Sequence, residues 1–509
     1  MEMSQAPRNG REVEPSNVDT EKIPENVISG IPRGCRSQSG SARSWSDKET
    51  MKRHRSTARL DVDRVQAHVP TMRETAGKHR SPPLARMPMG VLLRSLAFTT
   101  IMSTALLKPA MGFMRLMAVD DARLFSPQQN PLVRFALRSS FYKQFAAGEN
   151  EAEVGKTIRQ MKRQGFSGVI LGYAREIVVA REGRQPESVE VLTEADLRDI
   201  EMWKQGTRRT LKMVGPGDFL AVKFTGAGRI AVDACLQGLP LPPQPIRNAM
   251  DEICHEARAQ GSRIWIDAEQ TAVQRTLDLW VIDLMRRHNR GSTPLVYNTV
   301  QSYLKSAREN VINHLRLASK EGWTLGLKIV RGAYIANEPR GVIHDTKEDT
   351  DNNYNGIVRS LLSREYPGTD VNDNTYASLP HPPFPNMHLF VASHNVETIQ
   401  KAYLLHSARM REGLPTVPLE FGQLQGMADD LSCELLSCRQ ADLQSPNERV
   451  RAGAPKPFKC LSWGTPTELV QNLYRRAVEN TDAVQRSRNM ASALRTELWR
   501  RTGGRIFGG

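Results

Sequence analysis

Short apolar runs alternate with longer amphipathic stretches through the middle of the chain. The runs are rich in β-branched and aromatic residues and have the length of β-strands. We expect eight strands, at Gly168–Tyr173, Phe219–Thr225, Arg263–Ala268, Leu295–Val300, Leu325–Arg331, His388–Ser393, Pro418–Gly422 and Phe458–Ser462. Intervening stretches such as Thr271–Arg287 and Ser302–Glu321 have the apolar spacing of helices. This alternation predicts a parallel sheet with right-handed crossovers. Eight units in roughly 300 residues favour an α/β fold of the (β/α)8-barrel type over a doubly wound sheet.

Polar residues stand at the carboxyl ends of the predicted strands. Six of them share this place: Lys223, Asp267, Gln301, Arg331, His394 and Gln423. In barrels this end of the strands builds the active site. One such residue alone would indicate ordinary loop chemistry, but six in register predict a convergent pocket.

A helix is predicted directly after the eighth strand, within Gly464–Asn480. Thr465 can cap it, Pro466 occupies the first helical position, and Glu468 completes a capping box. Its polar face consists of Asn472, Arg475, Arg476 and Glu479. Adjacent arginines supply two planar forks, which suit a carboxylate or a phosphate. We expect this final helix to lie over the barrel mouth; the alternative is a solvated helix with an internal Arg–Glu pair.

The parts before and after the barrel have other compositions. Residues 1–88 lack apolar periodicity and predict a disordered N-terminal and targeting region. The first 25 residues are acidic, whereas the stretch from Met51 is basic and resembles a transit peptide. Residues 89–165 predict a helical extension with a continuous helical pattern over 130–165, the catalytic domain is expected at 166–482, and 483–509 predict a helical tail. Residues 89–118 are apolar but interrupted by charges, which indicates a helix packed on the domain or, alternatively, contact with a membrane surface.

Charge and cysteine usage narrow the function classes. The chain has 70 basic and 55 acidic residues, a net charge of +15. The excess fits a polyanion, an anionic membrane or a mitochondrial destination. Basic residues are spread through predicted helices and aromatics are only 6%, so no nucleic-acid partner is expected. The six cysteines show no metal-ligand spacing, which favours reduced thiols and argues against structural zinc.

Eight blocks carry a family resemblance: YAREIVV, AVKFTG, WIDAEQ, YNTVQSYL, KIVRGAY, VASHN, EFGQLQGM and NLYRRAVEN. In this order they resemble proline dehydrogenase, and their residues are most similar to those of its fungal mitochondrial branch. The resemblance covers about residues 90–500. The resemblance implies FAD-dependent oxidation of L-proline to Δ1-pyrroline-5-carboxylate, with electrons passed to ubiquinone. It also implies a mitochondrial location, on the matrix side of the inner membrane, with peripheral membrane contact.

The resemblance implies roles for individual residues. Lys223, Asp267 and Tyr334 match catalytic positions; Lys223, Arg475 and Arg476 match the group that holds the substrate carboxylate. Glu176 matches the carboxylate that pairs with Lys223. Positions matching FAD contacts are Asp267, Ala268, Gln301, Lys328, Val330, Arg331, Gly332, Ser393, His394, Asn395, Gln423, Arg476 and Glu479. No metal is expected, because His394 lacks a carboxylate or cysteine neighbour at ligand spacing. The chain has no GxGxxG, so the flavin would not lie on a Rossmann fold.

Some positions depart from the family pattern. The family often has Arg at Lys328, and bacterial relatives have aromatics at Cys460 and Asn472. The last two departures leave hydroxyproline dehydrogenase as a rival function. A rival of another class is a non-catalytic basic protein that binds nucleic acid or membrane. Two Pro/Asn/Asp-rich stretches, Ile335–Asn355 and Pro367–Pro385, predict loops or lids.

Overall fold

The computed structural model describes residues 82–103, 130–173, 188–368, 380–479 and 484–503, and the single positions 72, 109, 112 and 186. For 475–479 and 484–487 it describes the backbone alone. The chain divides into two units, Met1–Val69 and Pro70–Gly509. All described residues belong to the second unit. Most of the predicted targeting region, and Glu176, lie outside the described residues.

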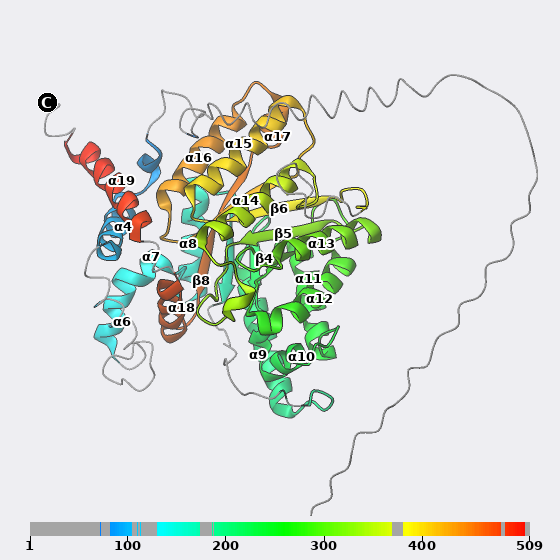
Figure 1. The fold of residues 1–509 in the computed structure, drawn as a ribbon. Coiled ribbons are helices and arrows are strands. Elements are labelled where there is room, and N and C mark those ends of the chain that lie inside the picture. Colours follow the sequence, from blue (N-terminus) through cyan, green and yellow to red (C-terminus); the bar gives the residue numbers. More distant parts are fainter. Residues whose placement is uncertain are drawn as a thin grey trace, which may run out of the picture. The chain divides into compact units, whose positions relative to one another are not determined.

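Eight parallel strands close into a barrel, which confirms the predicted fold (Figure 1). They are β1 (Gly168–Tyr173), β2 (Phe219–Val222), β3 (Arg263–Ile266), β4 (Val296–Gln301), β5 (Leu325–Val330), β6 (Met387–Ala392), β7 (Leu419–Leu424) and β8 (Lys456–Trp463). The register of β1 on β8 runs from Gly168↔Phe458 to Tyr173↔Trp463 and closes the barrel. Each strand begins within two residues of its predicted position, because apolar runs buried on both faces mark parallel strands clearly.

Helices follow the strands and cover the outside of the barrel (Figure 1). They are α8 (Glu151–Gln164), α9 (Glu194–Met213), α10 (Arg229–Leu236), α11 (Gln244–Gln260), α12 (Thr271–His288), α13 (Ala307–Glu321), α14 (Lys347–Ser363), α15 (Val396–Glu412), α16 (Asp429–Leu443) and α17 (Glu448–Ala452). The main core lies between strands and helices, and includes Trp280, Tyr354 and Phe421. A second cluster fills the barrel interior with Phe219, Tyr297, Phe390 and Phe458.

The prediction of a loop over Ile335–Asn355 was wrong in its second half. α14 begins at Lys347, with Thr346 and Asp349 forming a capping box. Its buried residues include Tyr354 and Ile357. The Asn- and Asp-rich exposed face concealed this periodicity in the sequence. Of the second predicted loop, residues 369–379 lie outside the described residues, and 380–385 form no helix or strand.

The continuous helical pattern predicted over 130–165 is interrupted. α6 (Pro131–Leu137), a π-helical turn η2 (Arg138–Tyr142) and α7 (Lys143–Phe145) precede a break before α8. Gly148, at φ 150°, forms an isolated bridge with Trp463 in this break. A Cβ at Gly148 would lie 2.5 Å from the Glu153 side chain, so glycine is required where the chain turns into α8. α8 then ends at Gln164, and Gly165 caps it in the left-handed conformation.

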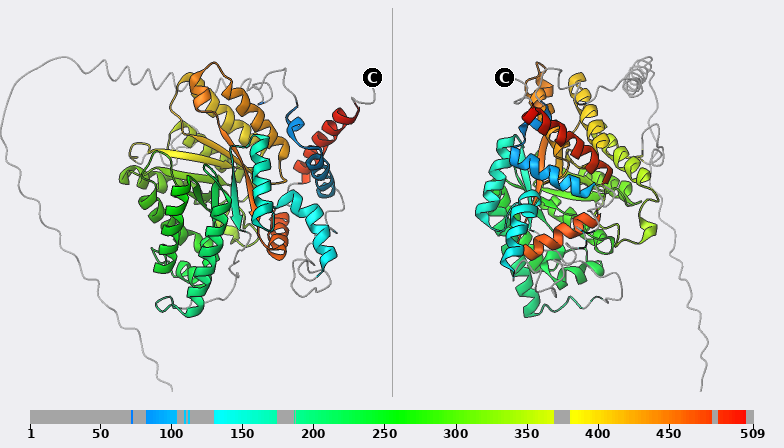
Figure 2. Two further views of the ribbon diagram at one scale, coloured as in Figure 1. Left: turned by 180° about the vertical axis from the view of Figure 1, so that it is seen from behind. Right: turned by 90° about the vertical axis from the view of Figure 1, so that its left-hand side faces the viewer.

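The terminal helices form a layer beside the barrel (Figure 2). α4 (Met89–Met102) packs against α19 (Val484–Gly503), burying Leu92, Met490 and Leu494. α18 (Pro466–Glu479) has the predicted capping box, with Thr465 and Glu468 exchanging hydrogen bonds. None of the described helices combines the length and apolar character that a membrane crossing requires.

Candidate active site

A pocket of about 310 Å³ opens at the carboxyl ends of the strands. All eight strands, or the residues directly after them, contribute to its wall, and Asn472 of α18 adds to it. The six polar residues predicted to converge all line this pocket: Lys223, Asp267, Gln301, Arg331, His394 and Gln423. Seven more predicted site residues line it too: Ala268, Lys328, Val330, Gly332, Tyr334, Ser393 and Asn395. The structure therefore confirms that the strand ends form one site.

An ion pair between Lys328 and Asp267 lies on the pocket wall. Lys328 of β5 donates to Asp267 Oδ1 at 2.8 Å, and its Nζ lies 3.4 Å from the centre of the Trp265 ring. The Lys328 side chain is 6% exposed, whereas Asp267 is 28% exposed. Burial lowers the pKa of Lys328 below its ordinary value, and the Asp267 carboxylate opposes that shift. A desolvated ammonium beside a carboxylate on a pocket wall marks a functional site.

A second lysine, Lys223, also lines the pocket. Lys223 follows β2, and its Nζ contacts the Tyr334 hydroxyl at 2.8 Å. The Lys223 carbonyl accepts a hydrogen bond from Trp203 Nε1 at 3.0 Å, which fixes the backbone against α9. Tyr334 comes from the connection between β5 and α14 and is buried. The structure thus brings together two predicted catalytic residues that are more than 100 positions apart.

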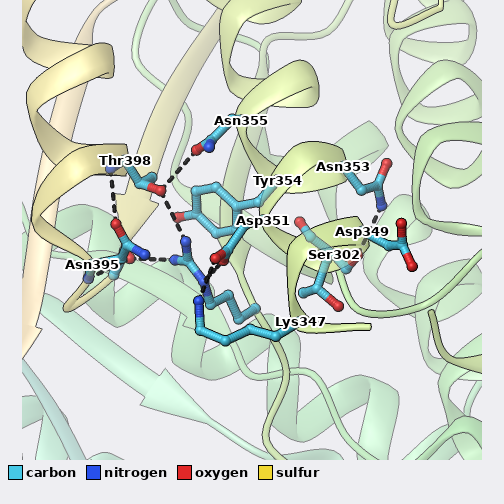
Figure 3. A network of polar contacts seen from close by, with 12 residues as sticks. Ser302, Lys347, Asp349, Asp351, Asn353, Tyr354, Asn355, Asn395 and Thr398 are labelled. Carbon is cyan, nitrogen blue, oxygen red and sulfur yellow. Dashed lines mark hydrogen bonds and ion pairs between the residues drawn. The ribbon is translucent and has the colours of Figure 1, made fainter. Parts of the chain in front are cut away.

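The guanidinium of Arg331 is held by three segments of the chain. Its Nε donates to Asp351 at 2.8 Å, Nη1 to Ser393 Oγ at 2.5 Å, and Nη2 to Thr398 Oγ1 at 2.9 Å. Burial acts to raise the pKa of Asp351, but hydrogen bonding by Lys347 and the Arg331 charge outweigh it, so the pKa lies below its usual range. Figure 3 shows Asp351 and Thr398 facing each other from α14 and α15. Arg331 is consequently a fixed cation on the pocket wall.

Amide and imidazole side chains form hydrogen bonds around the mouth of the pocket. Gln301 accepts from the Ala333 backbone N–H at 3.1 Å and donates to the Glu269 carbonyl at 3.0 Å. His394 Nε2 accepts from the Leu424 N–H at 3.0 Å. Gln423 Oε1 accepts from Ser432 at 3.1 Å. These side chains connect neighbouring strand ends and so keep the pocket open in a defined shape.

Other predicted residues are only partly placed. Arg475, Arg476 and Glu479 lie within α18, but nothing is described of their side chains. Asn472, which shares their predicted face, lines the pocket and is buried. Its Oδ1 has no hydrogen-bond partner among the described residues.

Sequence reasoning missed Trp265 and Thr299, which also line the pocket. Both lie inside strands rather than at strand ends. The signal was the two-residue period of β3, which directs Arg263, Trp265 and Asp267 to one side. Cys460 was noted only as a departure from the family, yet it lines the pocket as well.

The arrangement places the cations Lys223, Lys328 and Arg331, one carboxylate and a tyrosine hydroxyl around a small ligand volume, and of these cations Lys328 is the most buried. Such a donor set suits a ligand that carries negative charge and hydrogen-bond acceptors. Within the described part of the chain, no three His, Cys, Asp or Glu side chains are grouped as metal ligands would be.

A closed parallel barrel with charged residues at the carboxyl ends of its strands defines a (β/α)8-barrel enzyme. The sequence model of the family described as Proline dehydrogenase matches residues 154–489. The chain belongs to the proline dehydrogenase family, and it is an oxidoreductase of that family.

Curated relatives agree. The chain is 30% identical over 455 residues to the probable mitochondrial proline dehydrogenase of Schizosaccharomyces pombe, covering 81% of this chain and 88% of that protein. It is 32% identical over 258 residues to human mitochondrial proline dehydrogenase 1, covering 50% of this chain and 38% of that protein. It is also 30% identical over 415 residues to rat hydroxyproline dehydrogenase, covering 72% and 83%. The resemblance to a fungal mitochondrial relative is thereby confirmed.

Among solved structures, the chain is similar to proline utilization A of Bdellovibrio bacteriovorus. The TM-score is 0.54 and the identity 15%, with 83% of this chain and 42% of that protein covered. This chain therefore spans less than half of that longer protein. At this identity the likeness supports the barrel fold alone.

Proposed function

We propose that the protein oxidises L-proline to Δ1-pyrroline-5-carboxylate with FAD as the bound cofactor. Family membership supports proline oxidation. The observation that carries the proposal is the single pocket in which Lys223, Asp267 and Tyr334 meet. Membership of an enzyme family argues against the non-catalytic basic protein.

The pocket residues fit the chemistry of proline. The substrate has a carboxylate, which Lys223 holds together with Arg475 and Arg476. In this proposal Glu176 pairs with Lys223 and keeps its ammonium oriented. Tyr334 supplies a hydroxyl that can donate or accept a hydrogen bond beside Lys223. The two side chains are in contact at 2.8 Å. Enclosing proline between these groups excludes water from the pocket and orients the C5–H bond of proline.

The donor set also fits a flavin. Lys328 is an almost fully buried ammonium, Arg331 is a fixed guanidinium, and both line the pocket. Residues proposed to hold FAD are Asp267, Ala268, Gln301, Lys328, Val330, Arg331, Gly332, Ser393, His394, Asn395, Gln423, Arg476 and Glu479. Trp265 offers a ring face to the pocket and a buried Nε1–H that has no acceptor within the described part of the chain. When bound, the flavin supplies an acceptor for the hydride that leaves C5 of proline.

Electrons leave the enzyme, in this proposal, for ubiquinone. Two of the relatives named above are called mitochondrial, which supports a mitochondrial location. We place the protein on the matrix side of the inner membrane, in peripheral contact with it.

A second candidate function is oxidation of hydroxyproline. The buried Asn472 Oδ1 favours it: this oxygen has no hydrogen-bond partner among the side chains that the structure describes, and a ring hydroxyl could donate to it. Rat hydroxyproline dehydrogenase is also among the relatives. The ratio of kcat/KM for L-proline to that for trans-4-hydroxy-L-proline separates the two, and Asn472→Leu should raise this ratio if the amide serves hydroxyproline.

The test of the main proposal is turnover by the purified full chain supplied with FAD. We expect proline-dependent reduction of an artificial quinone and release of FAD on denaturation. A folded protein that binds no FAD, or that binds it and leaves proline unchanged, would refute the proposal.

A further inference from the structure

One buried carboxylate outside the proposed catalytic set joins three connections at the barrel mouth. Glu338 lies between β5 and α14 and is only 2% exposed. Glutamate is almost never so buried unless its charge is satisfied. The contacts of Glu338 should therefore show what satisfies its buried charge.

The Glu338 carboxylate accepts hydrogen bonds from two other connections. Oε1 lies 3.0 Å from the Thr271 backbone N–H, and Oε2 contacts the Thr271 hydroxyl. The Tyr303 hydroxyl donates to Oε1 at 3.1 Å. Thr271 begins α12, where the exposed N–H groups and the helix dipole favour a negative charge. Glu338 thus links the chain after β5 to the chain after β3 and after β4.

Tyr303 reinforces this link through Gly332. A Cβ at Gly332, where φ is 153°, would lie 2.3 Å from the Tyr303 ring. The Tyr303 N–H also donates to the Arg331 carbonyl at 2.7 Å. Burial and then the Glu338 charge raise the pKa of the Tyr303 hydroxyl, so it stays protonated as a donor.

Glu338 lies one turn away from Tyr334. The backbone N–H groups of Asn337 and Glu338 both donate to the Tyr334 carbonyl, at 2.8 and 3.1 Å. Of residues 331–342, all of them described, only Tyr334 and Glu338 are buried. The segment consequently has little apolar packing of its own, and the carboxylate is its polar anchor.

We propose that Glu338 is a positioning residue, which acts through Tyr334 on Lys223. It keeps the connection after β5 closed on the pocket, so that the Tyr334 hydroxyl stays at 2.8 Å from the Lys223 ammonium. The inference rests on the proposed function in so far as Lys223 holds the substrate carboxylate. Loss of the anchor should weaken substrate binding more than it slows the chemical step.

The test is a double-mutant cycle on the full-length enzyme. Glu338→Ala should raise KM for L-proline about tenfold, the size of one charge-assisted hydrogen bond, with kcat within about threefold. Tyr334→Phe should have a similar effect. The double variant should be no worse than Tyr334→Phe alone, because both changes act at one contact. Additive effects on KM would overturn the proposal.

Hydrogen–deuterium exchange supplies a readout independent of turnover. Amides of 331–342 should exchange faster in Glu338→Ala than in the wild type. Asp349→Asn is the matched control, since the Asp349 carboxylate also accepts hydrogen bonds at the start of a helix, α14, but accepts them from Thr346 at an exposed position. It should leave both KM and exchange at 331–342 unchanged. Equal exchange in Glu338→Ala and wild type would refute the anchor.

A milder variant guards against misfolding. Tyr303→Phe removes one partner of Glu338 and should raise KM two- to threefold, with faster exchange at 331–342. No change in either would overturn the proposal. If the wild type failed to oxidise proline, the proposed function would fall, while the exchange comparison would still judge the anchor.

Discussion

The two ends of the barrel each hold a buried cation on an aromatic ring with a carboxylate partner. At the amino end, Arg263 lies 3.9 Å from the centre of the Phe219 ring and pairs with Glu420 at 2.9 and 3.0 Å. At the carboxyl end, Lys328 lies 3.4 Å from the Trp265 ring and pairs with Asp267. Arg263 begins β3, and Asp267 directly follows the same strand.

The two pairs differ in their further hydrogen bonds and in how exposed their carboxylates are. Arg263 also donates to the Tyr297 hydroxyl and to the Gly217 carbonyl, and Glu420 is 3% exposed. Lys328 is a point charge, and its partner Asp267 is 28% exposed on the pocket. The Arg263–Glu420 pair, in which Nη1 contacts both carboxylate oxygens, is almost wholly buried and holds the barrel together. The Lys328–Asp267 pair exposes part of its carboxylate to the pocket and so retains capacity for a ligand. The comparison teaches that similar chemistry serves stability at one end and function at the other.

The largest expected effect on activity comes from breaking the carboxyl-end pair. Lys328→Met should lower kcat/KM for proline at least about 100-fold, or roughly 3 kcal/mol, because Asp267 loses its cation beside the reacting groups. Lys328→Arg should recover most of the activity, since the charge is kept. Steady-state kinetics with matched FAD content measure this. If kcat/KM of Lys328→Met lay within tenfold of the wild-type value, the assignment of function to the carboxyl end of the barrel would be contradicted.

Breaking the amino-end pair should act on stability instead. Arg263→Met leaves Glu420 buried without its cation and should cost about 3–5 kcal/mol of unfolding free energy. KM for proline should stay within about twofold, which denaturant titration and kinetics on one preparation can check. Adding Glu420→Gln should recover part of the loss. If Arg263→Met instead changed KM and left stability intact, the assignment of the two ends would be reversed.

A smaller effect is expected at α18, over the mouth. Arg475→Met should lower kcat/KM about tenfold, mostly through KM, because it removes charge-assisted bonds worth about 1.5–3 kcal/mol to the substrate carboxylate. Arg475→Lys should recover only part of this, since an ammonium lacks the planar fork. Wild-type kinetics in both variants would show that this face of α18 is merely solvated.

The smallest effect concerns pH at the amino end. Burial lowers the pKa of both His388 and His406 to about 4. Both are therefore neutral in the fold, while the unfolded chain takes up protons below about pH 6.5, so stability should fall as pH drops from 6.5 to 4. His406→Gln should reduce that slope by about 1 kcal/mol per pH unit. An unchanged slope would mean that His406 does not titrate in this way.

Much of this account could be predicted from the sequence. Apolar runs placed the strands, and the polar residues that follow them placed the pocket. Trp265 and Glu338 could not be found this way, because their roles depend on contacts with Lys328 and Tyr303, which lie far away in sequence. The start of α14 was hidden by its polar exposed face, although Thr346 and Asp349 did carry a capping signal. Pairing between distant residues is a property of the closed barrel, and one strand's pattern does not contain it.

The most direct test of the central claim is an anaerobic titration of the purified, FAD-loaded protein with L-proline, followed by its visible spectrum. The account predicts that the absorbance of oxidised flavin is lost at similar rates in the wild type and in Arg263→Met, under conditions where that variant is folded. In Lys328→Met at the same proline concentration the loss should be at least about 100-fold slower. Equal rates of bleaching in both variants would contradict the assignment of the reaction to the carboxyl end. A wild-type spectrum that proline does not change would contradict the proposed function itself.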